Sequence, residues 1–163
     1  MDDVARIQSA LAQVQTASRE ARRPGTTPWL VKTHVGWVHD VPTIDLSLLG
    51  GARLARRVVR QIKLIADDIE TGAVAFTTGS GSRGSMGPHS AVGTAVRDEL
   101  TQMCAEREWS FVASSHTQYT LIIDAEKAPL AAQNELGMLF YALTGGFGVA
   151  VVLAVLQMFG VFG

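Results

Sequence analysis

A row of basic side chains is the strongest candidate for binding chemistry in this sequence. Five cations recur at spacings of one, three or four residues within 51–68, and they are Arg53, Arg56, Arg57, Arg60 and Lys63. At 100° per residue, these positions fall within an arc of about 120° on one side of a helix. Like charges on one face repel one another, so the row predicts contact with RNA phosphates, anionic lipid headgroups or an acidic protein. The alternative is a face that is simply solvated.

A glycine-rich loop is the second candidate, because it is predicted to follow a strand and precede a helix. Gly79, Gly81 and Gly84 have the spacing G-x-G-x-x-G, and Arg83 stands between them. Backbone N–H groups in such a loop can surround an anion. The dinucleotide fingerprint also needs an acid after the next strand, where residues 113–115 read Ala-Ser-Ser. We therefore expect a flexible loop whose Arg83 contacts an anion, and nucleotide-dependent catalysis is the least favoured function.

Two tryptophans are candidate anchors for a protein partner. Trp29 and Trp37 lie in the stretch 24–42, which begins with Pro24 and reads as an extended linker. Tryptophan is a frequent energetic anchor in protein interfaces. The alternative, which the sequence leaves equally open, is that both pack over the protein's own core.

Cysteine and histidine give little sign of catalysis or metal binding. Cys104 is the single cysteine, which excludes an intramolecular disulfide and a multi-cysteine zinc site. The four histidines, at positions 34, 39, 89 and 116, do not have the short spacing of paired metal ligands. We expect no catalytic residue, metal or cofactor.

Composition limits the class of protein. The chain has 163 residues, 47% of them apolar and 18% charged, which excludes a wholly disordered chain. The formal net charge is −1, which excludes a globally basic nucleic-acid binder while still permitting a local basic patch.

The charged residues are absent from the C-terminal end. No Asp, Glu, Lys or Arg follows Glu135, and residues 138–159 carry only Thr144 and Gln157 as polar side chains. A bilayer core needs about 20 apolar helical residues. The stretch 138–160 therefore predicts a transmembrane helix, with a buried helix of a soluble domain as the alternative. Because no signal peptide is apparent, we expect a single-pass, tail-anchored protein with a cytoplasmic N-terminal domain.

Small residues recur every four positions within this segment, and they are Ala142, Gly146, Ala150 and Ala154. Such a stripe allows close approach of another helix in a bilayer. It predicts packing against other membrane-protein subunits or self-association, although Ala and Gly are also simply frequent in membrane spans.

The rest of the chain reads as an α/β (α+β) domain with an N-terminal helix. Residues 1–23 predict a helix that docks on its own domain or on a partner. The segment 43–126 predicts a small β-α-β-α-β-β sandwich, with residues 127–137 as a linker to the span. Within it, we expect strands over 43–48, 72–78, 110–115 and 119–124, and helices over 51–68 and 89–107. This order implies a mixed sheet with helices packed on it.

The ends of the first two of these strands carry a family resemblance. Asp45-Leu46 closes the first strand, and Thr78-Gly79-Ser80-Gly81 follows the second. With the element order, these residues resemble the Smr (small MutS-related) domain, which shows Asp-Leu-His-Gly and Thr-Gly-x-Gly motifs. The resemblance covers residues 43–124. It implies nucleic-acid binding or endonuclease activity, with Asp45 and the 79–81 loop near the working surface.

The sequence departs from this family where proton transfer would be expected. Ser47 stands in place of the histidine and Leu48 in place of the glycine. Serine cannot replace imidazole as a proton carrier near neutral pH, which weakens the nuclease interpretation. We therefore expect a tail-anchored, non-catalytic accessory or scaffold subunit of a membrane complex. The alternative is a membrane-tethered, Smr-like nucleic-acid-binding protein or nuclease.

Overall fold

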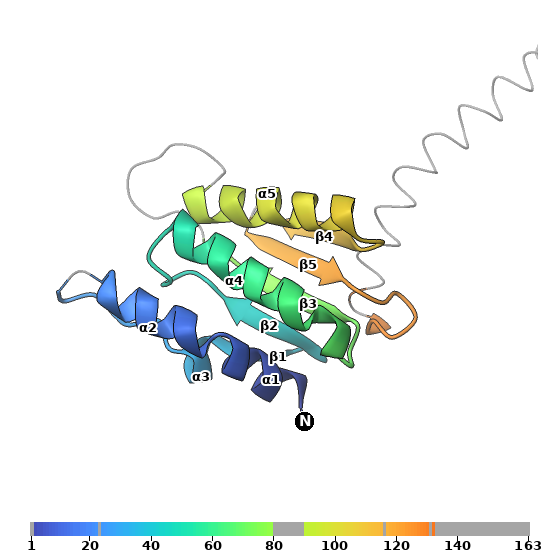
Figure 1. Cartoon of the computed structure of the whole chain (residues 1–163), viewed down its shortest axis with the longest axis horizontal. Helices are drawn as coiled ribbons and strands as arrows, with labels where there is room; N and C mark the ends of the chain where they lie inside the picture. Colours follow the sequence, from blue (N-terminus) through green and yellow to red (C-terminus); the bar gives the residue numbers. More distant parts are fainter. Residues whose placement is uncertain (1, 23, 80–89, 116, 131, 133–163) are drawn as a thin grey trace, which may run out of the picture.

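The domain has a sheet with its helices gathered over one face (Figure 1). The computed structural model describes residues 2–22, 24–79, 90–115, 117–130 and 132. The helices in this part are α1 (Asp3–Ala10), α2 (Ala12–Glu20), α3 (Val31–His34), α4 (Ala52–Ile65) and α5 (Ala91–Glu106), with a 3-10 turn at Ala66–Asp68. Helix α4 lies between α5 and the α1–α2 pair. The predicted α/β class is confirmed.

The sheet has the strand order β1-β2-β3-β5-β4. Its strands are β1 (Val35–Val38), β2 (Val41–Asp45), β3 (Ala73–Thr77), β4 (Ser110–Ser115) and β5 (Gln118–Ile122). Strands β2 and β3 are parallel, and α4 connects them, whereas the other pairs are antiparallel. The mixed sheet predicted for 43–126 is therefore present.

Strand β1 comes from the stretch predicted to be an extended linker, so that prediction was wrong for residues 31–38. Val35 there is 3% exposed and belongs to the core beside Ile44 of β2. The turn to β2 places His39 at φ 49° and Asp40 at φ 63°, the left-handed pair that a two-residue hairpin needs. The four residues of β1, Val-Gly-Trp-Val, show no alternation of burial and were too short a segment to mark this strand in the sequence.

The N-terminal helix packs on its own domain. Helices α1 and α2 meet at Leu11, and four apolar side chains at helical spacing, Val4, Ile7, Leu11 and Val14, are all buried. Asp3 is also buried, and its carboxylate accepts hydrogen bonds from the backbone N–H groups of Glu70 and Thr71 at 3.0 and 2.8 Å. The helix therefore docks on its own domain, which is the first of the two alternatives that the sequence left open.

Helix α4 is amphipathic, with the basic row on one side and buried apolar residues on the other. It begins after Gly51 and ends where the chain tightens into the 3-10 turn. Val58 and Ile62 lie in the core, together with Ala55 and Val59. Leu54 and Ile65 are partly buried at the margin of the core.

The opposite face of the sheet carries a second, smaller cluster. It consists of Val41, Ala73, Ala75 and Ile122 from the strands, covered by Ala128 and Ala132. Gly72 fixes the chain that leads there, because its carbonyl accepts from the N–H groups of Ile123 and Asp124 at 2.8 and 3.0 Å. Ala132, the last described residue, therefore lies on the face opposite the helices.

Both edges of the sheet have modified backbone patterns. On β1, the carbonyl of Val35 accepts from the Gln8 side chain at 3.0 Å, and the N–H of Val35 bonds back to Val31. On β4, the register shifts between Ala113 and Ser115. The predicted span 138–160 lies outside the described residues, among which no helix has the length and apolar character to cross a membrane.

Candidate functional site

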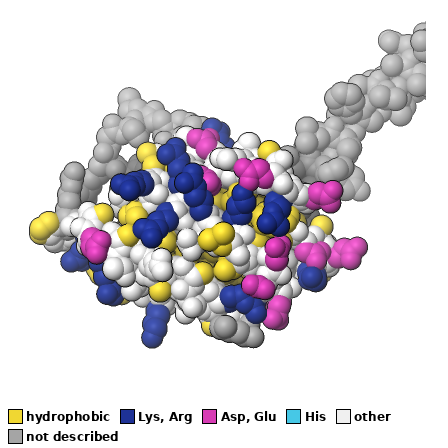
Figure 2. All heavy atoms as spheres, in the orientation of Figure 1, with side chains coloured by type: hydrophobic (Ala, Val, Ile, Leu, Met, Phe, Trp, Pro, Cys, Tyr) yellow, Lys and Arg dark blue, Asp and Glu magenta, His cyan; other side chains and the backbone are white. Residues whose placement is uncertain are grey.

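The predicted basic row lies on the outer side of α4, where Figure 2 shows dark blue side chains gathered. Arg53, Arg56 and Arg57 are exposed. Among the described residues, no acidic side chain lies within ion-pair distance of these three guanidinium groups. We call these three residues the arginine surface.

The other two members of the row are paired with α5. Arg60 donates from Nε and Nη2 to the two carboxylate oxygens of Glu99, at 2.7 and 3.1 Å. This hydrogen bond and the charge of Glu99 raise the pKa of Arg60. Lys63 pairs with Glu106, and that bond lowers the pKa of the Glu106 carboxyl. Five unopposed charges on one face were predicted, and α5 neutralises two of them.

Sequence reasoning missed these acidic partners. Glu99 and Glu106 are seven residues apart on α5, which places both on one side of a helix. Glu99 is 8% exposed. This spacing can be read in the sequence. That the two acids face the cations of α4 depends on the packing of α5 against α4, which the sequence alone does not show.

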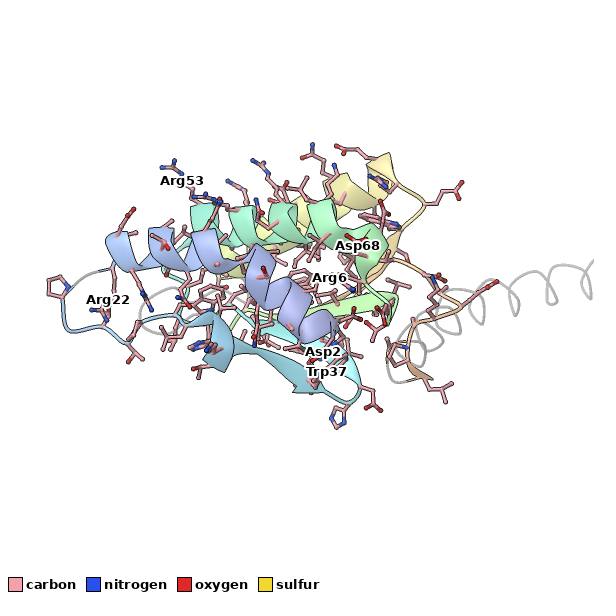
Figure 3. The ribbon with its side chains drawn as sticks, turned by 60° about the horizontal axis from the view of Figure 1, so that its bottom comes forward. Asp2, Arg6, Arg22, Trp37, Arg53 and Asp68 are labelled. Carbon is pink, nitrogen blue, oxygen red and sulfur yellow. The ribbon has the colours of Figure 1, made fainter. Side chains whose placement is uncertain are left out.

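A groove and a cleft adjoin the arginine surface. The groove, of about 550 Å³, runs between α2 and α4, where Ala17 and Ala21 face Arg53 and Arg57. The cleft, of about 900 Å³, shares Ala21 and Gly50 with the groove. Figure 3 shows Arg22 and Arg53 toward the same end of the domain, on the loop after α2 and at the start of α4. Arg22 was not among the predicted residues, because it lies in a separate segment.

The cleft reaches the carboxyl end of β2, where the family resemblance was strongest. Asp45 accepts from the N–H of Ser47 at 2.9 Å. Gly79, at φ +60°, lies so close that a β-carbon there would stand 2.9 Å from Cβ of Ser47. The two motif segments are therefore neighbours in space. Gly81, Arg83 and Gly84 lie outside the described residues.

The two predicted tryptophan anchors have different environments. Trp29 is 1% exposed, and its Nε1–H donates to the carbonyl of Asp45 at 2.6 Å. It belongs to the core, as the alternative interpretation had it, and is closed to a partner. Trp37 is 46% exposed on β1.

The remaining predicted features add no reactive group within the described chain. Cys104 is partly buried, and burial raises the pKa of its thiol. No group of three or more His, Cys, Asp or Glu side chains there is arranged to hold a metal ion. The small-residue stripe Ala142, Gly146, Ala150 and Ala154 lies outside the described residues.

Comparisons with family models, with curated proteins and with solved structures found no match to this chain. The description of the site therefore rests on its own geometry.

Proposed function

We propose that this protein is a tail-anchored, non-catalytic accessory subunit that binds a partner of a membrane complex through the arginine surface. The observation that carries the proposal is the exposure of Arg53, Arg56 and Arg57 without ion-pair partners in the described chain. Two of them, Arg53 and Arg57, also line the groove. Unpaired guanidinium groups are ready for bidentate recognition of carboxylates or phosphates. The uncharged C-terminal segment supplies the tether in this proposal.

The test is extraction of the full-length protein from native membranes in mild detergent. We expect it to co-purify with a partner and to run above the mass of its own monomer in detergent. The variant Arg53→Gln/Arg56→Gln/Arg57→Gln is expected to remain in the membrane fraction and to lose that partner. A monodisperse wild-type monomer without an associated protein would refute the proposal.

A second candidate is a membrane-tethered, Smr-like nucleic-acid-binding protein or nuclease. The contact of Gly79 with Ser47 favours it, because this contact brings together the two segments that resemble the family motifs. Binding of RNA and DNA at two salt concentrations tests it, since phosphate contacts make affinity depend on salt. Absence of salt-dependent binding, or the same binding after the three arginines are replaced, would end this candidate.

A further inference from the structure

The two helices beside α4 differ in the side chains that they present to its cations. On one flank, α5 supplies Glu99 to Arg60 and Glu106 to Lys63. On the other flank, α2 presents Ala17 and Ala21, and Glu20 is the one acid lining the groove within the described residues. The groove is lined by Arg53, Arg57 and Arg60, and of these three cations Arg60 is the one paired with a carboxylate of α5.

The groove and the cleft together suggest an elongated ligand. They join at Ala21 and Gly50, so a chain lying along the arginine surface could continue past the start of α4. The cleft has apolar lining as well, since Leu48 is 45% exposed there. A ligand of this site combines negative charge with an apolar group.

The face of the sheet opposite the helices bears on whether anionic lipid headgroups could be this ligand. Ala128 and Ala132 lie on the face opposite the helices, and the predicted span begins at residue 138, a few residues further on. The arginine surface lies on the other face of the sheet from Ala132, the last described residue before that span. In our proposal, this arrangement places the arginine surface away from the lipid. Anionic headgroups are then poorly placed to be its ligand.

Whole-molecule charge argues against a long polyanion. The net charge is −1, so the domain as a whole provides no long-range electrostatic attraction for a nucleic acid. A short acidic segment would contact only the local cationic patch. The pairs already formed with α5 show that carboxylates suit this row of cations.

We propose that the arginine surface and the adjoining cleft bind an acidic segment of a partner protein, with an apolar residue of that segment in the cleft. This inference rests on the proposed function and adds the chemistry of the partner and the side from which it approaches.

The test uses full-length protein in detergent micelles and a fluorescent oligoglutamate peptide that ends in leucine. Binding is measured by anisotropy at low and high salt, about 0.05 M and 0.3 M, because salt screens exposed charges. The variant Arg53→Gln/Arg56→Gln/Arg57→Gln is expected to bind about tenfold more weakly at low salt, a loss of about 1.4 kcal/mol. The matched control, Lys32→Gln/Arg97→Gln/Lys127→Gln, removes the same charge elsewhere and is expected to bind like wild type.

Competing ligands complete the design. Single-stranded RNA and vesicles containing phosphatidylserine are tested with the same three proteins. The proposal is overturned if either of them binds more tightly than the peptide and depends on the three arginines, or if the control loses as much peptide affinity as the arginine variant.

The two proposals can fail separately. If the arginine variant still co-purifies with its membrane partner, the acidic-segment inference is wrong while the accessory function stands. If wild type carries no partner yet binds the peptide through the three arginines, the accessory function is wrong while the acidic-segment site stands.

Discussion

Burial decides how much each tryptophan contributes to the stability of the fold. Trp29 fills the core and satisfies the carbonyl of Asp45, whereas Trp37 is half exposed on an edge strand. Trp29→Ala is expected to lower the free energy of unfolding by about 3–5 kcal/mol, because it leaves a large cavity. Trp37→Ala is expected to cost less than about 1 kcal/mol. Urea unfolding followed by circular dichroism measures both, and equal losses would contradict this assignment.

Asp3 makes stability depend on pH. Burial opposes its ionisation, but bonds from the N–H groups of Glu70 and Thr71, the Thr71 hydroxyl and Arg6 outweigh burial and lower the pKa of Asp3. A carboxyl whose pKa is lowered by folding stabilises the protein above its unfolded pKa, about 3.9, and loses that contribution as pH falls through the folded value.

The corresponding variant is Asp3→Asn. At pH 7 it is expected to lower the free energy of unfolding by about 1–3 kcal/mol, because buried hydrogen-bond donors lose a charged acceptor. The difference from wild type is expected to shrink below about pH 4, where the unfolded carboxyl also takes up its proton. A difference that stays constant from neutral pH to about pH 3 would show that charge is not the cause.

The paired and unpaired arginines are expected to differ in thermal stability. Arg60 holds the largely buried carboxylate of Glu99, whereas Arg53 has no acidic partner in the described chain. Arg60→Gln therefore leaves Glu99 without its cation and is expected to lower Tm, while Arg53→Gln leaves Tm near that of wild type. Differential scanning calorimetry makes the comparison, and an equal fall in Tm would contradict it.

At the scale of elements, Gly72 lies directly before β3, and its carbonyl holds the chain that leads from β5 to the smaller cluster. It has φ +65°, and a β-carbon there would stand 2.5 Å from the carbonyl oxygen of Asp124. Gly25 has φ +81° with no atom within 4 Å, so it separates the cost of backbone conformation from the cost of collision.

The two glycines give a matched experiment. Gly25→Ala is expected to cost about 1 kcal/mol, the usual penalty for a left-handed residue with a side chain. Gly72→Ala is expected to cost about 2–4 kcal/mol, because it adds a collision with backbone to that penalty. Chemical unfolding of both variants checks the order. If Gly25→Ala costs the same or more, the turn after Gly72 is not held as described.

The elements show which signals in the sequence were reliable. Helix α4 and the strands of 43–126 were predictable, because their apolar residues recur with a clear period. Strand β1 was not, since its four residues include Gly36 and the exposed Trp37. Docking of α1 and α2 remained open because an apolar stripe does not say which surface covers it.

The candidate site was also predictable only in part. The cations of α4 follow from helical spacing alone, so the row could be read before the fold was known. Which of them are neutralised could not be read, because Glu99 and Glu106 reach Arg60 and Lys63 from a helix about 40 residues away in sequence. The groove likewise depends on α2 lying beside α4.

At the scale of the whole molecule, the sheet separates the helices that carry the arginine surface from the smaller cluster around Ala128 and Ala132. Under our proposal, the face with the smaller cluster is the one nearer the membrane. Leu64 on α4 and Leu130 on the opposite side are each 75% exposed, which makes them matched reporters. In a Cys104→Ser background, Leu64→Cys and Leu130→Cys can each carry a fluorophore in protein reconstituted into vesicles. A quencher attached to lipid headgroups is expected to act more strongly at position 130. Equal quenching would contradict the inferred orientation.

The treatment of the sheet edges has a consequence for crowding. In the tethered state that we propose, many copies would be confined to two dimensions, where exposed strand edges would favour aggregation of neighbouring copies by strand pairing. The Gln8 side chain already occupies the carbonyl of Val35 on one edge, and the bulge between Ala113 and Ser115 distorts the other. Growth by strand addition is thereby discouraged at both ends, so a high local density can raise partner capture without promoting aggregation.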